Sequence, residues 1–331
     1  MNDAAQVVDL GIPTLPAVLD PVQLAKHLEF FSRPPWEWGR VREIGVNVLK
    51  SHSGSRCTVD IALLTSGGVH SVVGKVYASD GFGVYQAMKR ISEAGFGPDA
   101  EFSIPQPLAF LADLHLLVQE KVRGRTAEEL FLTDDPRCRV LTAERCARWL
   151  ARFQALAPKT GPVFDMNEYL ASLERWSRRI AELGEPLAGK ANRLFERLER
   201  AASDLAPIET CAGHGSYCHT QIILANDRIV TFDWDGYDVA DPSRDVARFI
   251  VALERLALGR FGSTRAFDSA AEAFRKTYIA CGRPEVESHL PFFEAAVCIK
   301  LAKYELSRRP LHWRQMVIGG MLDEGLHKLE Q

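Results

Sequence analysis

The stretch that decides the fold of this chain is HGSYCHTQIIL at residues 214–224, followed by RIVTFDWD at 228–235 and DVADPSRD at 238–245. A polar loop leads into one apolar run, and a second apolar run follows the polar pair Asn226 and Asp227. Apolar runs rich in β-branched residues and separated by a short polar turn are typical of a strand hairpin. The sequence therefore predicts a loop, two short strands and an acidic segment here.

Acidic side chains follow the second of these strands. Asp233 comes at the strand end, where a carboxylate can face a cleft and bind a metal ion. Asp235 is separated from it by Trp234, and this alternation predicts that both acids share one face of an extended strand. Asp241 and Asp245 precede an apolar helical pattern, and we expect them to cap that helix or tie down the loop before it.

Outside this stretch, the hydrophobic pattern changes once along the chain. Before residue 125 it predicts mainly strands joined by short turns, and after residue 125 mainly helices. The expected elements are a leader helix at 20–32, three strands within 41–78, a helix at 83–95, a hairpin within 108–122, and helices at 142–157, 164–184, 188–203 and within 243–331. Strands first and helices later predict an α+β fold of two unequal lobes, residues 1–120 and 121–331, the second containing the motif region 214–245.

Composition narrows the class of protein. The chain has 331 residues, 47% of them hydrophobic, and a formal net charge of −3, which is ordinary for a globular protein and lacks the basic excess of most nucleic-acid binders. No apolar run approaches a membrane span, and the first residues lack the pattern of an export signal. Seven scattered cysteines without a C-x-x-C pair are then read as reduced thiols, so we expect a cytoplasmic protein without nucleic-acid or membrane partners.

The three motifs together resemble the aminoglycoside phosphotransferase/choline kinase-like family of the protein-kinase-like superfamily. That family shows H-G-D-x-x-x-x-N, then I-D-[WF]-[ED], then G-D-P-x-x-D, and this chain has HGSYCHTQ, FDWD and ADPSRD in the same order. Upstream, SHSGSRC at 51–57, VVGKVY at 72–77 and LLVQEKVRGR at 116–125 resemble the phosphate-covering turn, the strand with the nucleotide lysine, and the hinge. The resemblance covers roughly residues 40–260.

The resemblance implies a bilobal protein-kinase-like fold with an N-terminal antiparallel sheet lobe and a larger helical C-terminal lobe. It also implies Mg²⁺-dependent transfer of the γ-phosphate of ATP to a hydroxyl group of a small molecule. Phosphoryl transfer of this kind needs positioning and charge neutralisation more than covalent help. The nucleotide would be bound by Gly54, Lys75, Glu120 and Val122.

Two positions of the resembling loop differ from the family pattern. The family's catalytic Asp aligns with Ser216, and a serine hydroxyl is a poor base at neutral pH. The metal-binding Asn aligns with Gln221, which keeps the carboxamide oxygen on a longer side chain and would bind Mg²⁺ together with Asp233. Asp235 and His219 are candidates for a substitute base near Ser216.

These differences leave several functions open. The chain could be a slow small-molecule kinase, a kinase with a substitute base, or a pseudokinase that binds nucleotide or a protein partner without turnover. Loss of a positioned general base lowers a rate by ~10²–10⁴-fold, which leaves the other contributions in place. A kinase-like fold used for another reaction, such as elimination of a phosphorylated group, is a further alternative.

Charge and histidine patterns suggest two more conclusions. Residues 121–331 hold 31 basic and 30 acidic side chains, so the lobe expected to build the acceptor site is not strongly acidic, which argues against a polycationic substrate. Cys211, His214, Cys218 and His219 have zinc-ligand side chains, but structural zinc sites usually have two separated pairs of ligands. We expect His214 to be a packed residue that braces the loop.

Overall fold

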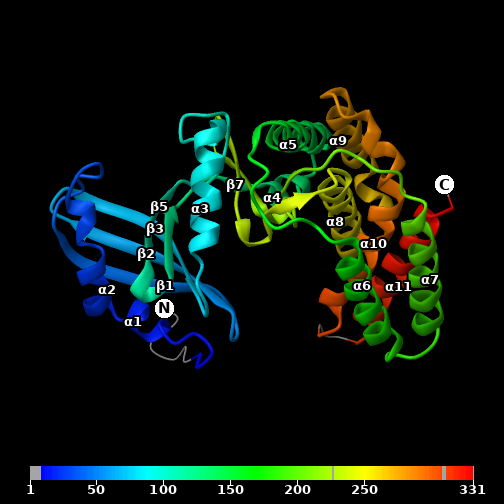
Figure 1. Cartoon of the computed structure of the whole chain (residues 1–331), viewed down its shortest axis with the longest axis horizontal. Coiled ribbons are helices and arrows are strands. Elements are labelled where there is room, and N and C mark those ends of the chain that lie inside the picture. The colour runs from blue at the N-terminus through cyan, green and yellow to red at the C-terminus, as the bar shows by residue number, and fades with distance from the viewer. Residues whose placement is uncertain (1–8, 226, 308–310, 331) are drawn as a thin grey trace. The chain divides into compact units, whose positions relative to one another are not determined.

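The computed structural model describes residues 9–225, 227–307 and 311–330 (Figure 1). The chain divides into two compact units, Met1–Arg123 and Gly124–Gln331. The predicted turn residue Asn226 lies outside the described residues.

The first unit is built on a five-stranded antiparallel sheet in the order β1-β2-β3-β6-β5. Its strands are β1 (Val41–His52), β2 (Arg56–Thr65), β3 (Gly68–Tyr77), β5 (Pro107–Leu111) and β6 (Leu116–Glu120). Every second residue of β2 is buried, from Cys57 to Thr65, because successive side chains of a strand point to opposite faces. The three predicted strands within 41–78 and the hairpin within 108–122 are confirmed.

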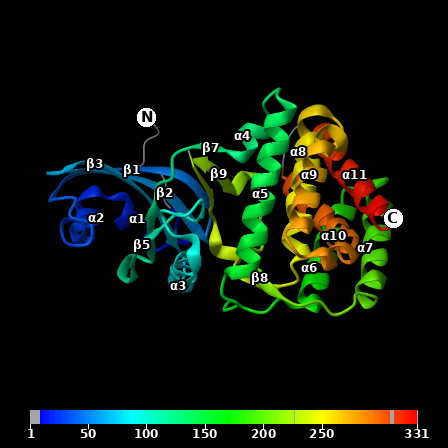
Figure 2. The ribbon, with the colours of Figure 1, turned by 90° about the horizontal axis from the view of Figure 1, so that it is seen from above.

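Short helices cover this sheet. Helices α1 (Leu15–Leu19) and α2 (Pro21–His27) lie against this sheet (Figure 2). They contribute buried side chains to the same apolar cluster as β1–β3. Asp20 caps α2 by accepting hydrogen bonds from the backbone N–H groups of Val22 and Gln23. Helix α3 (Phe82–Ile91) packs beside β5, and the two-residue strand β4 (Phe102–Ser103) follows it along the chain.

The second unit consists mainly of helices. They are α4 (Ala127–Phe131), α5 (Pro136–Leu156), α6 (Met166–Ala181), α7 (Leu187–Ser203), α8 (Ser243–Phe261), α9 (Asp268–Ala280), α10 (Leu290–Ala302) and α11 (Leu311–Lys328). Helix α10 is buried on nearly all sides and packs against α6, α7, α8 and α11. A helix that is apolar all round belongs in a core, so α10 forms the centre of this unit.

Short strands interrupt the helices where the sequence predicts them. Strands β9 (Ile222–Ala225) and β10 (Arg228–Thr231) are antiparallel, and β7 (Arg125–Thr126) pairs with β9 on its other side. A second small ladder joins β8 (Cys211–Gly213) to β11 (Asp238–Ala240). The two ladders bracket the loop 214–221 and the acidic segment 232–237.

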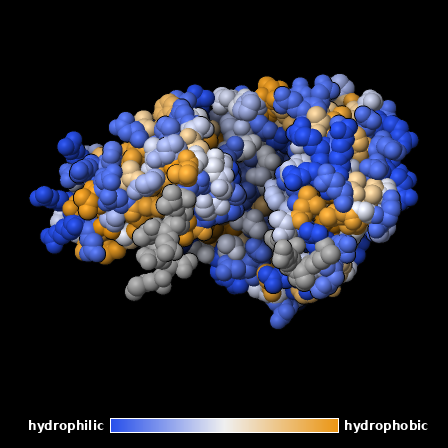
Figure 3. Space-filling model, turned by 90° about the horizontal axis from the view of Figure 1, so that it is seen from below, coloured by the Kyte–Doolittle hydropathy of each residue, from blue (hydrophilic) through white to orange (hydrophobic). Residues whose placement is uncertain are grey.

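None of the helices in the described ranges is long and apolar enough to cross a membrane. On the face drawn in Figure 3, hydrophilic residues cover most of the second unit, interrupted by small hydrophobic patches.

Candidate active site

The loop that follows β8 is held by one buried carboxylate. Asp245, in the first turn of α8, accepts hydrogen bonds from the backbone N–H groups of His214 (2.6 Å), Gly215 (3.3 Å) and Tyr217 (3.4 Å). Asp245 is only 1% exposed. The expectation that Asp245 ties down the loop is thus confirmed, and the loop backbone is fixed to the start of a long helix.

Two further contacts shape this loop. Gly215 has a φ of 80°, and a Cβ at this position would collide with the backbone oxygen of Gly236. Only glycine adopts this left-handed conformation without cost and permits such a close approach. Arg244 binds Asp238 through two parallel hydrogen bonds of 2.6 and 2.5 Å, which fixes β11 against the same helix.

Ser216 is connected to a buried histidine. The Nε2 of His214 lies 3.1 Å from the backbone oxygen of Phe232, so Nε2 carries the proton and Nδ1 is the acceptor nitrogen of the ring. The Oγ of Ser216 lies 3.4 Å from that Nδ1. His214 is fully buried and its ring lies 4.7 Å from that of Trp234, which confirms that it braces the loop.

Gln221 lies between Ser216 and Asp233. Its Nε2 donates to the Oγ of Ser216 at 3.0 Å and to Oδ2 of Asp233 at 3.3 Å. Its Oε1 accepts a hydrogen bond from the Sγ of Cys218. The structure therefore brings three of the predicted site residues together, with the NH₂ group of Gln221 turned toward Asp233.

Asp233 and Asp235 do not share a strand face, so that prediction is wrong. Strand β10 ends at Thr231, and Asp233 has a left-handed backbone with a φ of 75°. Asp235 then lies in the one-turn 3-10 helix Trp234–Gly236. The backbone turn at Asp233 breaks the period of two on which the prediction depended.

His219 lies apart from the other predicted catalytic residues. It is 4% exposed and lines a cavity of about 520 Å³ that does not include Ser216. Burial, together with the positive charges of Arg255 and Arg248, lowers the pKa of His219 to about 3. The imidazole is therefore neutral at physiological pH, and its side chain is directed to another part of the second unit.

The four residues predicted to bind the nucleotide lie in the first unit. Lys75 is in β3, opposite Thr58 of β2 and Leu117 of β6, and is 8% exposed. Gly54 is in the turn between β1 and β2 with a φ of 67°. Its backbone N–H donates to Oδ2 of Asp9 at 2.9 Å, so a carboxylate of the leader segment already occupies this amide.

Glu120 and Val122 lie at the end of β6. The backbone N–H of Glu120 donates to the backbone oxygen of Gln106, and its Oε2 accepts from the backbone N–H of Gln106 at 3.1 Å. Val122 is half-buried just beyond the strand. Between them, Lys121 forms an ion pair of 2.7 Å with Asp60 of β2.

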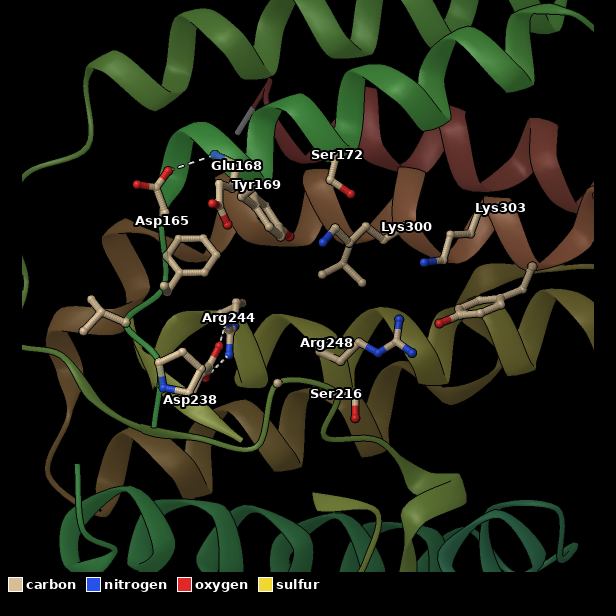
Figure 4. Close-up of a pocket in the computed structure, with 16 residues that line it drawn as sticks. Asp165, Glu168, Tyr169, Ser172, Ser216, Asp238, Arg244, Arg248, Lys300 and Lys303 are labelled. Carbon is tan, nitrogen blue, oxygen red and sulfur yellow. Dashed lines mark hydrogen bonds and ion pairs between the residues drawn. The ribbon is translucent and has the colours of Figure 1, made fainter. Parts of the chain in front are cut away.

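The second unit contains a cavity of about 430 Å³ that Ser216 lines. Its walls come from α6, α8, α10 with the turn after it, β11, and the segments 162–165 and 215–216 (Figure 4). Sequence reasoning did not find this cavity, because its charged side chains come from helices far apart in the chain and follow no motif. The local signals were two basic pairs at helical spacing, Arg244 with Arg248 on α8 and Lys300 with Lys303 at the end of α10.

The described ranges contain no group of three or more His, Cys, Asp or Glu side chains placed to bind a metal ion. Cys211, His214, Cys218 and His219 do not form such a group in the described residues. A single carboxylate such as Asp233 still suits Mg²⁺, which proteins often bind through one or two carboxylates together with substrate phosphates.

Comparisons with known proteins agree with this arrangement. The profile of the phosphotransferase enzyme family matches residues 78–285, which include both small ladders and the loop between them. No curated protein sequence matches the chain.

Several solved structures share the fold at low sequence identity. A choline/ethanolamine kinase family protein from Mesorhizobium loti is 12% identical, with a TM-score of 0.59 over 93% of this chain and 95% of that one. A thermostable mutant of aminoglycoside phosphotransferase APH(4)-Ia, in complex with ADP and hygromycin B, is 15% identical, with a TM-score of 0.59 over 91% and 98%. The amicoumacin kinase hAmiN, in complex with AMP-PNP, Ca²⁺ and Ami, is 13% identical, with a TM-score of 0.60 over 86% and 88%. These matches confirm the predicted α+β, kinase-like fold.

Proposed function

This chain belongs to the phosphotransferase enzyme family, and we propose that it transfers the γ-phosphate of ATP to a hydroxyl group of a small molecule in a Mg²⁺-dependent reaction. The observation that carries the proposal is the loop 214–221. One buried carboxylate fixes its backbone, and Ser216, Gln221 and Asp233 form one hydrogen-bonded group beside a cavity.

The nucleotide part of the proposal rests on the first unit. Lys75 would neutralise the α- and β-phosphates, and the turn at Gly54 would offer backbone N–H groups to them. Glu120 and Val122 would present backbone groups to the adenine edge. The structures of relatives with ADP and AMP-PNP support nucleotide binding by this fold.

Asp233 would be the main protein ligand for Mg²⁺. A bound Mg²⁺ would supply charge neutralisation of the phosphate oxygens. Gln221 would become a second Mg²⁺ ligand only after its carboxamide rotates by half a turn, because its NH₂ group faces Asp233. That rotation breaks the present hydrogen bonds of Gln221 to Ser216 and Cys218, and the hydroxyl of Ser216 would then donate to the carboxamide oxygen instead.

Ser216 would position the acceptor hydroxyl rather than take its proton. Its Oγ accepts from Gln221, can donate to Nδ1 of His214, and keeps one acceptor site for a substrate hydroxyl. With a loose, metaphosphate-like transition state, positioning and charge neutralisation contribute most of the catalysis, so the absence of a strong base at position 216 would slow the reaction rather than abolish it. Asp235 is the substitute base that we retain, whereas His219 lines a different cavity and has no part in the proposed chemistry.

The second candidate function is a pseudokinase, which binds nucleotide without turnover. The observation that favours it is the neutral hydroxyl of Ser216 at the position of the family's catalytic carboxylate. Consumption of ATP in the presence of a hydroxylated substrate, with loss of that consumption in Asp233→Ala, would exclude it.

Nucleotide binding by the full chain tests the proposal directly. Thermal unfolding is measured with and without ATP or ADP, each with Mg²⁺, for the wild type and the variants Lys75→Ala and Asp233→Ala. A matched control is Lys89→Ala, an exposed lysine of the same unit. We expect nucleotide to raise the Tm of the wild type and the control, and to raise it much less in both site variants. No shift in the wild type at millimolar nucleotide would refute the proposal.

A further inference from the structure

The cavity beside Ser216 contains an excess of positive charge. Four basic side chains line it, two from α8 and two from α10 and the turn after it. Three acidic side chains also line it. The basic residues are Arg244, Arg248, Lys300 and Lys303, and the acidic residues are Asp165, Glu168 and Asp238. The acidic and basic side chains differ in their hydrogen-bond and ion-pair partners. This difference decides whether the cavity attracts a negatively or a positively charged ligand.

Two of the three carboxylates are already engaged. Asp238 forms its two hydrogen bonds with Arg244, so that pair contributes no net charge. Asp165 caps α6 by accepting from the backbone N–H of Glu168 at 2.8 Å. In Figure 4, Asp165 and Glu168 lie together at one end of the cavity, on the side of Tyr169 away from Lys303.

The other three cations have no such partner. In the part of the chain that the structure describes, no carboxylate forms an ion pair with Arg248, Lys300 or Lys303. Their contacts are with aromatic rings instead: Lys300 lies 4.1 Å from the ring centre of Tyr169, and Lys303 lies 4.9 Å from that of Tyr304. The buried Nε of Arg248 has no hydrogen-bond partner among the described residues.

Crowding of these cations has a measurable consequence. Burial, followed by the charges of Lys303, Arg244, Arg248 and Arg175, lowers the pKa of Lys300 to about 8. Bringing like charges together is costly, and an anion bound among them would reduce that cost. Figure 4 shows Lys300 and Arg248 on opposite walls of the cavity, with Ser216 on the same side as Arg248, and all three residues line this cavity.

We propose that the acceptor of this enzyme is a hydroxylated small molecule that carries an anionic oxygen group, phosphate or carboxylate, and that Arg248, Lys300 and Lys303 bind that group beside Ser216. The inference rests on the proposed kinase function and assigns the chemical class of its acceptor. Lysine and arginine together are the usual recognition groups for phosphate and carboxylate. A polycationic acceptor would be repelled by the same three side chains.

Binding of inorganic phosphate to the full chain, measured by calorimetry at pH 7.0 and low ionic strength, tests the site without knowledge of the acceptor. The variants are Lys300→Met on α10 and Arg248→Gln on α8, which change the site from two independent helices. The matched control is Lys276→Met, a surface lysine of α9 paired with Glu272. A parallel titration with acetate distinguishes a carboxylate site from a phosphate site.

We expect phosphate to bind the wild type and the control, and to bind each site variant at least ~10-fold more weakly, a difference of about 1.4 kcal/mol. Tighter binding of acetate than of phosphate in the same site would favour a carboxylate acceptor. Because phosphate can also bind near the nucleotide lysine, Lys75→Met is measured in parallel. Thermal unfolding without ligand shows that each variant is folded.

Three results would overturn the inference. The first is no phosphate or acetate binding by the wild type. The second is binding that is lost in Lys75→Met but unchanged in Lys300→Met and Arg248→Gln, which would leave the kinase proposal standing. The third is phosphate binding through Lys300 in a protein that binds no nucleotide, which would remove the acceptor role together with the proposed function.

Discussion

Removing the negative charge of Asp245 should loosen the loop that carries Ser216. Its carboxylate accepts three backbone hydrogen bonds, two at Oδ2 from His214 and Gly215 and one at Oδ1 from Tyr217. An asparagine has one acceptor oxygen, so either orientation of its amide places an NH₂ group against at least one of these N–H donors. Asp245→Asn therefore both weakens the remaining bonds and leaves buried donors unpaired.

The expected cost can be estimated from these contacts. A hydrogen bond to a charged group contributes about 1.5–3 kcal/mol, and an unsatisfied buried donor costs about 1–3 kcal/mol. Two of the three bonds exceed 3.2 Å, so we expect values at the lower end and partial relaxation of the loop. The free energy of unfolding should fall by about 2–3 kcal/mol in Asp245→Asn and by about 3–5 kcal/mol in Asp245→Ala.

Urea unfolding followed by circular dichroism measures this difference, with Asp268→Asn as the matched control. Asp268 is also an aspartate in the first turn of a helix, α9, but its side chain is exposed. Its substitution removes only a helix-dipole interaction of about 0.3–1 kcal/mol. If Asp245→Asn were no less stable than Asp268→Asn, the carboxylate would not be what holds the loop, and the reasoning would be wrong.

Three further outcomes are expected. Asp9→Asn should bind ADP several-fold more tightly in a fluorescence titration, because it removes an anion that occupies the backbone N–H of Gly54; unchanged affinity would show that phosphates do not approach this turn. Sulfate, whose charge is constant over this range, should bind less tightly as the pH rises from 7 to 9.5, because Lys300 loses its proton above a pKa of about 8, whereas burial raises the pKa of Tyr169 to about 12 and keeps that phenol neutral. The dependence on pH should disappear in Lys300→Met. Ser216→Asp should raise turnover of a neutral hydroxylated acceptor by up to ~10²–10⁴-fold, measured as ADP release, and should weaken phosphate binding.

The sheet of the first unit could be predicted from the sequence because one of its faces is buried. Residues 57–65 alternate between apolar and more polar side chains, and the observed burial of β2 follows that alternation. The leader helix was predictable for a different reason, since Asp20 can satisfy backbone donors that the first turn leaves unpaired. Both signals are local, so neither depends on the rest of the chain.

The details of the site were less predictable, because they depend on contacts between distant segments. The alternation at Asp233 and Asp235 looked like a strand, but the left-handed backbone at Asp233 turns the chain there. The amide of Gly54 was expected to face phosphates, yet the leader residue Asp9 binds it. The residues next to Asp233 and Gly54 in the sequence do not predict these contacts, because the contacts form only when the chain has folded.

The cationic cavity gives a physical reason for the serine at position 216. Two unit charges of the same sign 4 Å apart repel by about 4 kcal/mol at an effective dielectric constant of 20. A carboxylate at Ser216 would therefore repel an anionic acceptor in the same cavity, and it would attract Arg248 and Lys300 and compete for them. Ser216 avoids both effects and still accepts hydrogen bonds. If the acceptor is anionic, the loss of a base of ~10²–10⁴-fold is offset by ground-state binding that an aspartate would destroy. The same substitution that argues for a pseudokinase when Ser216 is considered alone is thus compatible with an enzyme when Ser216 is considered with α8 and α10.

Measuring Ser216→Asp with a neutral and an anionic acceptor separates the two explanations. An enzyme adapted to anions should gain turnover with the neutral acceptor and bind the anionic acceptor more weakly. A gain of turnover without any change in anion binding would refute this explanation.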